Sequence, residues 1–463
     1  MENLKTPKGT RDYAGEERIL LESIIKKTED IYKARGGVPF DTPTFEIKSV
    51  LTNKYGEDSK LIYDLADQGG ESCALRYDLT VPLARYLGQT KTLKMKRYQT
   101  GKVFRRDQPI MNKGRYREFF QSDFDIVGEY ERMAADAEIV SSACEILKSF
   151  SEMMDNRAFE LRINHRGLVD AIMEVCGIPA PLHRAIGSAV DKLDKLSWAD
   201  VRCEMAEKGA CDASIDKLAE YIKMKGPLSL IAQLKATEIS NTPEGAQSLN
   251  DLERLYELLI VYGIDECVTL DLSLIRGLDY YTGLLLEGGY AGGEGSVIAG
   301  GRYDKLVSSM QEKTADTLAG AMASATIKKK TKPLPSVPCV GVSLGVSRLF
   351  GMVAAPSRRT YVDVLVCSVG AGLFEERMRT CVHLRKQGIC AEYFMGTSGN
   401  FSRHSEYAEL HGIPFLVLFG RKELEAKEYQ IIWGERNDRQ KQTVSLEELP
   451  AALRALIGQG SSV

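Results

Sequence analysis

The stretch RYREFFQSDFDIVGEY, residues 115–130, carries an amide and two carboxylates at the spacing of a β-strand. Side chains in a strand alternate between two faces, so Phe120, Ser122, Phe124 and Ile126 would share one face. The opposite face would carry Arg117, Phe119, Gln121, Asp123, Asp125 and Val127. An isolated amphipathic strand usually turns such a polar face to water. The alternative is that this face holds a ligand, and the rest of the chain has to decide between the two.

A basic cluster precedes this strand in KVFRRDQPIMNKGRYREFF, where two predicted strands are joined by a loop. Its members are Arg105, Arg106, Lys113, Arg115 and Arg117. Arginine binds phosphate through two parallel N–H groups and keeps its charge at any cellular pH. A hairpin that adds Phe119, Gln121 and Asp125 would offer phosphate donors, an aromatic face for a base and acceptors for an amine. A solvated hairpin with scattered charge is the alternative.

Two more stretches carry candidate residues. LRYDLTVPLARYL places Asp78, Leu79 and Thr80 between a predicted strand and a predicted helix. LIRGLDYYTG lies between apolar runs and contains Arg276, Asp279, Tyr280 and Tyr281. A tyrosine pair in a β segment is usually core packing, but an arginine beside it is hard to bury without a partner.

Several other chemistries are disfavoured. GVSLG, residues 341–345, matches the nucleophile elbow of α/β-hydrolases, but the histidines that follow it all fall in a separate C-terminal segment. Asp123 and Asp125 lack the further ligands of a calcium-binding EF-hand loop. The ten cysteines form no CxxC pair and the five histidines no HExxH pattern, so zinc is not expected.

Composition is that of a soluble globular protein of several domains, with 463 residues, 44% hydrophobic and 27% charged. A net charge of −3 gives no sign of nucleic acid, although a basic surface can be local. We find no signal peptide and no apolar run of the ~18 residues that a membrane span needs. The scattered cysteines suit reduced thiols, and a cytosolic location is the default expectation.

The predicted elements change in character along the chain. Residues 16–35 are expected to form a helix that stops at Gly36. Residues 133–154 are expected to form a second helix, and residues 164–262 read as consecutive helices. After residue 360, strands alternate with helices, which predicts βαβ units in a mostly parallel sheet.

Together these motifs resemble those of class II aminoacyl-tRNA synthetases, and among them histidyl-tRNA synthetases of the eukaryotic type. RGLDYYTG, residues 276–283, is the most specific signature. VPFDTPTFE is similar to the first motif of the class, a dimer-interface segment with its proline at Pro43. RRDQPIMNKGRYREFFQSDFDIVG resembles the second motif and GVSLGVSRLF the third. The likeness extends from TPKGTRDY near the start to the C-terminal tail.

The resemblance implies an α+β catalytic domain with an antiparallel sheet, the class II synthetase fold, in residues 1–360. A helical insertion would occupy residues 164–262, and a C-terminal α/β anticodon-binding domain residues 361–463. It also implies a cytoplasmic homodimer, with organellar use open, that binds tRNA(His) and no membrane.

The implied reaction joins L-histidine and MgATP into histidyl-adenylate and then passes histidine to the 3′ end of tRNA(His). It needs no protein nucleophile, no tightly bound organic cofactor and no zinc. By resemblance, Arg105 contacts the α-phosphate and Arg276 supports the transferring phosphorus. Arg115 contacts the outer phosphates, and Phe119 stacks on adenine with Arg348 on the other face of the base.

The resemblance also implies a histidine site. Its backbone-binding and ring-binding residues are expected to be Asp78, Leu79, Thr80, Arg105, Gln121, Asp125, Arg276, Tyr280 and Tyr281, of which Asp125 and the tyrosines read the imidazole. A site that hydrogen-bonds a polar side chain rejects apolar analogues without an editing domain.

One departure concerns Ser347, which stands where the family usually has an acidic residue, and it leaves open how the nucleotide is anchored. Two alternatives stay open at this point. One is a non-catalytic synthetase-like regulatory or sensor protein, and the other is a synthetase for another amino acid.

Overall fold

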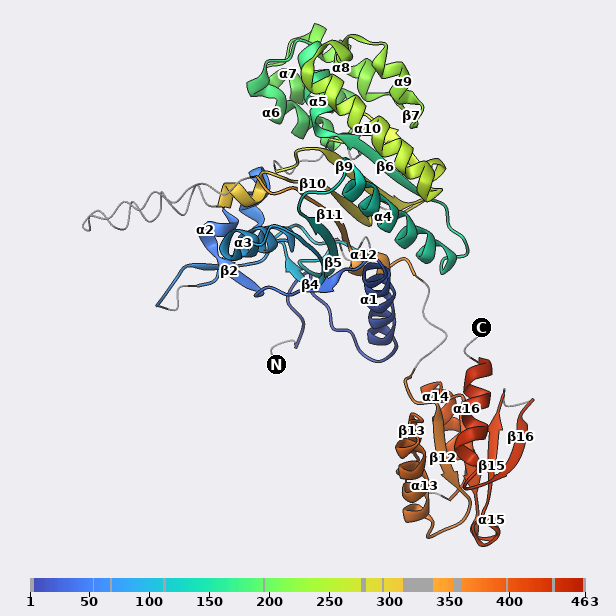
Figure 1. The fold of residues 1–463 in the computed structure, drawn as a ribbon. Helices are drawn as coiled ribbons and strands as arrows, with labels where there is room; N and C mark the ends of the chain where they lie inside the picture. Colours follow the sequence, from blue (N-terminus) through green and yellow to red (C-terminus); the bar gives the residue numbers. More distant parts are fainter. Residues whose placement is uncertain are drawn as a thin grey trace. The chain divides into compact units, whose positions relative to one another are not determined.

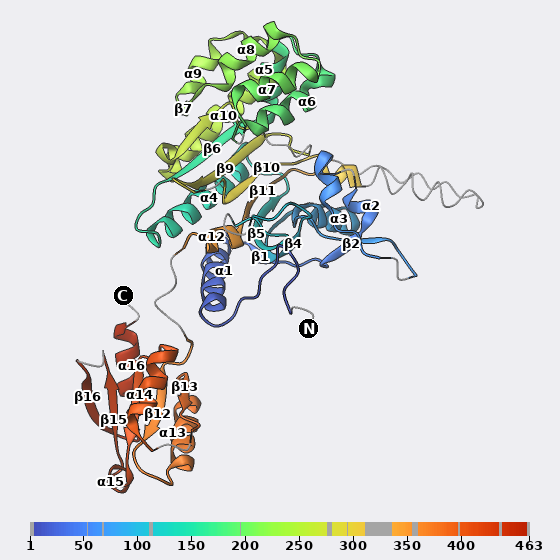
Figure 2. The ribbon, with the colours of Figure 1, turned by 180° about the vertical axis from the view of Figure 1, so that it is seen from behind.

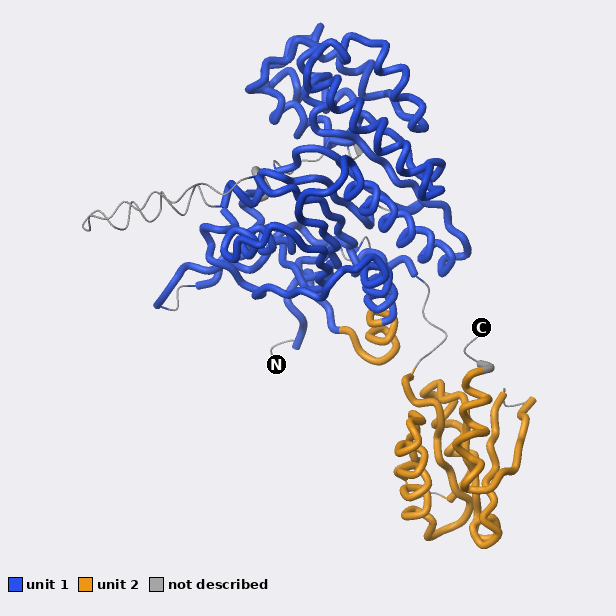
Figure 3. The backbone as a smooth tube through the Cα atoms, viewed as in Figure 1, with its two compact units in different colours: residues 1–12, 23–354 blue, residues 13–22, 355–463 orange. Residues whose placement is uncertain are grey.

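The computed structural model describes most of the chain in two compact units (Figure 3). One unit comprises residues 1–12 and 23–354, and the other residues 13–22 and 355–463. The described residues are 4–52, 54–66, 69–110, 114–194, 196–275, 280–293, 295–310, 336–353, 360–396, 399–434 and 438–460.

One mixed sheet forms the centre of the first unit (Figure 1). Its described strands, in spatial order, are β1 (Val38–Pro39), β4 (Met95–Phe104), β5 (Glu118–Val127), β11 (Cys339–Leu344), β10 (Ile298–Arg302), β9 (Leu284–Tyr290), β6 (Phe159–His165), β8 (Val268–Asp271) and β7 (Lys225–Pro227). From β4 to β6 in this order every neighbouring pair is antiparallel. Parallel pairs join β1 to β4 and β6 to β8. The antiparallel sheet predicted for the catalytic domain is confirmed.

The β4–β5 hairpin brings two polar stretches together. Its register pairs Arg97 with Asp125, and Gln99 with Asp123. Because these positions alternate with Tyr98 and Phe124, the polar side chains share one face of the hairpin and the aromatic ones share the other.

Helices cover this sheet and lead into its strands. Outside the insertion they include α1 (Glu16–Ala34), α2 (Lys48–Leu51), α3 (Thr80–Thr90), α4 (Ala134–Glu152) and α12 (Val346–Phe350), with the 3₁₀ helix η1 (Gly56–Leu61). The short pair β2 (Phe45–Ile47) and β3 (Cys73–Leu75) forms a separate sheet. Helix α1 ends as predicted at a left-handed Gly36, and α4 packs across β5, β9 and β11 (Figure 2).

A helical segment lies between β6 and β8, two adjacent parallel strands that a helical crossover has to connect. Its elements are α5 (Arg166–Val175), α6 (Ala180–Val190), η3 (Asp191–Asp194), α7 (Trp198–Glu207), α8 (Asp212–Ile222), α9 (Leu230–Lys235), η4 (Glu238–Asn241), α10 (Pro243–Tyr262) and η5 (Asp265–Cys267). The helices expected over residues 164–262 are present, but residues 164 and 165 still belong to β6.

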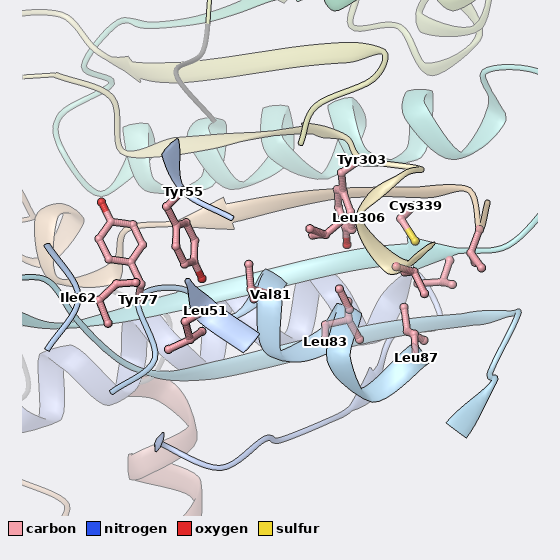
Figure 4. Close-up of a cluster of buried hydrophobic side chains, with 14 of the residues drawn as sticks. Leu51, Tyr55, Ile62, Tyr77, Val81, Leu83, Leu87, Tyr303, Leu306 and Cys339 are labelled. Carbon is pink, nitrogen blue, oxygen red and sulfur yellow. The ribbon is translucent and has the colours of Figure 1, made fainter. Parts of the chain in front are cut away.

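A buried hydrophobic cluster supports the hairpin from one side (Figure 4). It combines α2, α3, the residues after β10 and the start of β11. Labelled members are Leu51, Tyr55, Ile62, Tyr77, Val81, Leu83, Leu87, Tyr303, Leu306 and Cys339. The hydroxyls of Tyr55 and Tyr303 donate hydrogen bonds to Asp78 and Asp125, and the face of the Tyr77 ring lies against Arg105.

The second unit contains β12 (Val364–Ser368), α13 (Phe374–Lys386), β13 (Ala391–Tyr393), α14 (Phe401–His411), β14 (Phe415–Phe419), α15 (Arg421–Ala426), β15 (Glu428–Trp433), β16 (Gln440–Ser445) and α16 (Leu449–Gly460). The predicted alternation of strands and helices holds through β14. The expected mostly parallel sheet is wrong, because β12 pairs in parallel with β13 and β14, whereas β15 and β16 pair antiparallel. Only six residues, 434–439, separate β15 from β16, too few for the crossover connection that parallel pairing requires. Within the described ranges, no helix of either unit is long and apolar enough to cross a membrane.

Candidate active site

A small pocket opens over the centre of the sheet, where β5, β11 and β10 run side by side. Its lining includes Thr80, Asp125, Tyr280, Tyr281, Tyr303 and Gly341. The enclosed space is about 10 Å³, close to what one water needs. An imidazole ring can therefore enter only when lining side chains move.

Gly341 leaves room for the Asp125 carboxylate. The two residues face each other across the β5–β11 ladder. A Cβ atom built on Gly341 would lie 1.9 Å from Oδ1 of Asp125, far inside van der Waals contact. The pocket thus depends on the absence of a side chain at this position.

Changing Gly341 to alanine is expected to push the Asp125 carboxylate out of its present position. For the substrates that the motif resemblance implies, we expect the KM for histidine in pyrophosphate exchange to rise about tenfold, with the KM for ATP nearly unchanged. Gly370→Ala is not a suitable control, because Gly370 has a positive φ of 99°. Gly226→Ala is suitable, since nothing lies within 4 Å of a Cβ built there. Equal KM values for histidine in both variants would contradict this account of Gly341.

Asp125 takes part in a buried charge cluster with Arg97 and Asp123. The Nη2 of Arg97 lies 2.8 Å from Oδ2 of Asp125 and 3.9 Å from Oδ2 of Asp123. All three side chains are almost completely buried. One guanidinium thus faces two carboxylates, which leaves the ionised cluster with one negative charge.

The hydroxyl of Tyr303 donates a hydrogen bond to Oδ1 of Asp125. Burial raises the pKa of Asp125 to about 6, while Arg97 acts in the opposite direction. Burial also raises the pKa of Tyr303 well above its usual value, so the phenol remains a donor. At neutral pH Asp125 is therefore an ionised acceptor at the floor of the pocket.

Gln121 and Ser343 hold the neighbouring carboxylate. The Nε2 of Gln121 donates to Oδ1 of Asp123 at 2.9 Å and to Oγ of Ser343 at 3.1 Å. The Oγ of Ser343 in turn donates to Oδ1 of Asp123 at 2.6 Å. Ser343 lies inside strand β11 and not at a strand-to-helix turn, so it is no nucleophile elbow.

Asp78 lies at the start of α3, next to Thr80 of the pocket lining. Its Oδ1 accepts hydrogen bonds from the backbone N–H groups of Thr80 and Val81, at 3.2 and 3.0 Å, and from the Tyr55 hydroxyl at 2.9 Å. These contacts cap the helix. Burial raises the pKa of Asp78 to about 6. The carbonyl of Leu79, the next residue, accepts from Arg97 at 3.0 Å.

Arg105 lies next to Asp78 at the end of β4. Its Nε donates to the Tyr77 carbonyl at 3.1 Å, and its guanidinium carbon lies 4.3 Å from the Tyr77 ring centre and 5.2 Å from the Phe119 ring centre. The guanidinium is held by a backbone carbonyl and two rings. This leaves the remaining N–H groups able to bind an anion.

Arg115 and Arg348 are engaged elsewhere in this structure. Arg115 forms a two-pronged pair with Oδ2 of Asp107, at 3.1 and 2.8 Å, within the loop that joins β4 and β5. Arg348 donates to the Ser296 carbonyl and passes close to Gly114 of the same loop. A phosphate at Arg115 would have to replace Asp107.

Ser347 has a clear structural contact. Its Oγ accepts the backbone N–H of Phe120 at 2.9 Å, which fastens α12 to the edge of β5. A serine therefore does locally what a carboxylate could also do as an acceptor. Compared with an acidic residue, the serine removes a negative charge next to Arg348, and its hydrogen bond joins the segments that resemble the second and third motifs.

Of the predicted residues, Thr80, Asp125, Tyr280 and Tyr281 line the pocket. Gln121 is hydrogen-bonded to Ser343 of the lining, Asp78 to the backbone of Thr80, and Leu79 to Arg97. Arg105 lies beside the Phe119 ring. The predicted residues Arg276 and Asp279 lie outside the described residues, as does Lys113. Sequence reasoning gave no role to Arg97, Asp123, Tyr303, Tyr55 or Ser343. The alternation of polar residues along the strand could have indicated Asp123. No sequence pattern indicated a site role for the other four residues.

A larger cavity of about 690 Å³ lies between the β5–α4 loop, α10 and the start of β9. Among its charged lining groups, Arg302 pairs with Asp304 and with Asp136 behind it, and Asp251 pairs with Arg132. None of the predicted site residues lines it. Across the described residues, no group of three or more His, Cys, Asp or Glu side chains is arranged to hold a metal ion.

A mixed sheet with this antiparallel centre, and a β4–β5 hairpin that joins arginines to a polar pocket, define the class II aminoacyl-tRNA synthetase fold. The family model described as histidyl-tRNA synthetase matches residues 9–323, and the model described as an anticodon binding domain matches residues 363–456. Because the first match spans more than half of the chain, the chain belongs to the histidyl-tRNA synthetase family.

Similar proteins agree with this assignment. The probable cytoplasmic histidine–tRNA ligase of Encephalitozoon cuniculi is 40% identical over 455 residues, which cover 98% of this chain and 99% of that protein. The human mitochondrial histidine–tRNA ligase is 41% identical over 440 residues, 91% of this chain and 82% of that protein. The crystal structure of histidyl-tRNA synthetase from Nostoc superimposes with a TM-score of 0.79 at 25% identity, covering 98% of this chain and 100% of that one.

Proposed function

We propose that this chain is a histidine–tRNA ligase, which activates L-histidine with ATP and transfers histidine to the 3′ end of tRNA(His). The observation that carries the proposal is the single polar face of β5. Phe119, Gln121 and Asp125 lie along one strand, beside Arg105 and Asp78. This strand can therefore bind a base, the backbone groups of an amino acid and an imidazole ring at successive positions along its length.

In the first step, a carboxylate oxygen of histidine attacks the α-phosphorus of ATP. A new O–P bond forms, the bond from the α-phosphorus to the bridging oxygen breaks, and pyrophosphate leaves. Arg105 would bind the α-phosphate, whose negative charge spreads in the transition state, and Arg276 would assist it by resemblance. Catalysis here rests on positioning and positive charge, because no side chain forms a covalent bond.

MgATP would bind as a substrate of the first step. Phe119 and Arg348 would hold adenine and Arg115 the outer phosphates, after release from Asp107. Magnesium bound mainly by phosphates and water needs few protein ligands.

Asp125, Tyr280 and Tyr281 would read the imidazole, while Asp78, Leu79, Thr80 and Gln121 would hold the amino and carboxyl groups of histidine. The second unit would bind the anticodon, and the family match over residues 363–456 supports this. Recognition of unstacked bases there would rely on shape, stacking and hydrogen bonds.

We also propose a homodimer that uses residues 38–47. Val38 is 51% exposed, Phe45 55% and Ile47 41%, so apolar side chains gather on the segment that resembles the first class motif. The expected result is twice the chain mass in sedimentation equilibrium, and a Phe45→Glu variant that dissociates. A fully active monomer would rule out this arrangement.

A cytoplasmic location is proposed, with organellar use open. The Encephalitozoon relative is named as cytoplasmic and the human one as mitochondrial. Fractionation of cells that express the tagged chain is the direct measurement.

The decisive experiment is exchange of labelled pyrophosphate into ATP with each of the twenty amino acids in turn. Histidine alone should drive rapid exchange. If no amino acid drove exchange, the chain would be a non-catalytic binding protein. Faster exchange with another amino acid would identify a synthetase for that amino acid.

A further inference from the structure

Arg97 is a completely buried arginine with no role assigned above, and its side chain is 0% exposed. It lies on β4 directly opposite Asp125 on β5. Its Nη2 pairs with Asp125 at 2.8 Å and also donates to the Leu79 carbonyl at 3.0 Å. Burying a guanidinium costs desolvation free energy unless its partners compensate. A buried arginine beside the pocket therefore suggests a specific role.

Arg97 is itself held from the opposite side. Its Nη1 donates to Oε1 of Gln99 at 3.2 Å, and its guanidinium carbon lies 5.8 Å from the Phe40 ring centre. The Nε2 of Gln99 donates to Oδ1 of Asp41 at 2.8 Å and to Oγ1 of Thr42 at 3.2 Å. A chain of contacts thus runs from residues 40–42 through Gln99 and Arg97 to the pocket.

From this arrangement we infer that Arg97 is a positioning residue for imidazole recognition, which keeps the Asp125 carboxylate ionised and fixed beneath the histidine ring. This inference rests on the proposed function and names a determinant of substrate choice within that site. Arg97 would not touch the substrate, because Asp125 lies between them.

The charges around Asp125 explain why Arg97 is needed. Acidic or weakly acidic groups lie near Asp125 on β5, on β11, after β10 and before α3, and the cation in direct contact with it is Arg97 of β4. These groups are Asp123 on β5, Tyr303 after β10, Cys339 on β11 and Asp78 before α3. Without Arg97, two buried carboxylates would be left side by side, and such a pair keeps one proton to higher pH. A protonated Asp125 is a much weaker acceptor for the imidazole N–H than the carboxylate, because the hydrogen bond loses its charge.

The test compares Arg97→Met and Arg97→Lys with a matched control, Arg35→Met. Arg35 also faces two carboxylates, Glu138 and Glu145 of α4, but it lies away from the pocket. The measurement is pyrophosphate exchange with the full chain, at varied histidine and at varied ATP, from about pH 6.5 to about pH 8.5.

Arg97→Met should raise the KM for histidine about twentyfold and the KM for ATP less than about twofold. Its KM for histidine should fall as the pH rises, because the carboxylate pair then loses its retained proton. Arg97→Lys should recover part of the affinity, since it returns the charge without the planar fork. Arg35→Met should leave both KM values and their pH dependence as in the unmodified chain.

Arg97→Met can fail to fold, because it leaves two buried carboxylates unpaired. In that case Gln99→Met tests the inference. It keeps the charge of Arg97 but removes the hydrogen bond to Gln99 that holds the guanidinium in place. It should raise the KM for histidine severalfold and not that for ATP. Equal rises in both KM values, or a loss of stability with unchanged KM values, would overturn the inference. Absence of histidine-driven exchange in the unmodified chain would instead overturn the proposed function.

Discussion

Replacing Arg105 with alanine is expected to slow histidine-dependent pyrophosphate exchange on the order of 10³-fold, with a much smaller change in the KM for histidine. The reason is the place of its positive charge. The guanidinium is fixed by the Tyr77 carbonyl and by the rings of Tyr77 and Phe119, and it needs no reorganisation when charge develops on the α-phosphate. An interaction that strengthens in the transition state lowers kcat when it is removed.

Arg106 provides the matched control for this experiment. It is the next residue, carries the same charge and is exposed. Arg106→Ala should change kcat less than about threefold, because an exposed charge is largely screened. Arg105→Lys should recover little, since a single ammonium cannot keep the carbonyl contact and also bind the phosphate with two N–H groups. Comparable losses for Arg105→Ala and Arg106→Ala would show that general positive charge, and not this position, matters.

The polar face of β5 could be predicted from the sequence because strand alternation has a period of two and needs no partner. Its partner could not. Arg97 meets Asp125 only through the register of the hairpin, and the intervening loop from Arg105 to Arg117 is too long to fix that register. Tyr303 reaches Asp125 from 178 residues away along the chain, a contact that no local pattern reveals.

For two local sequence patterns, the role of the residues became clear only from their packing in the structure. The GVSLG stretch looks like a nucleophile elbow, but its glycine makes room for Asp125 and its serine donates to Asp123. Ser347 looked like a lost carboxylate, yet it keeps the hydrogen bond to Phe120 that joins α12 to β5. Motif spacing predicted which segments meet, whereas the role of each atom depended on the pairing of β5 with β11.

Changing Asp125 to asparagine is expected to raise the KM for histidine on the order of 10²- to 10³-fold, with kcat and the KM for ATP much less affected. Asparagine has the same shape but turns either a neutral oxygen or an NH₂ group toward the imidazole. It also leaves Arg97 without its closest carboxylate, although Asp123 remains 3.9 Å away. Histidine therefore loses a charged acceptor in a buried site, where such a loss is large.

Stability separates this result from simple unfolding. Because burial raises the pKa of Asp125 to about 6, the folded state holds this proton more tightly than the unfolded chain does. The stability that the protonated form contributes is therefore lost as the pH rises through about 6, and at neutral pH the ionised side chain opposes folding. Asparagine avoids that cost, so the melting temperature at pH 7.5 should stay within a few degrees of that of the unmodified chain. The matched comparison is Asp107→Asn, which weakens the partly buried pair with Arg115 away from the pocket and should leave the KM for histidine unchanged. If Asp125→Asn bound histidine normally in the exchange assay, the imidazole would have to be read by the tyrosines alone, and the negative charge at the pocket floor would serve packing and not recognition.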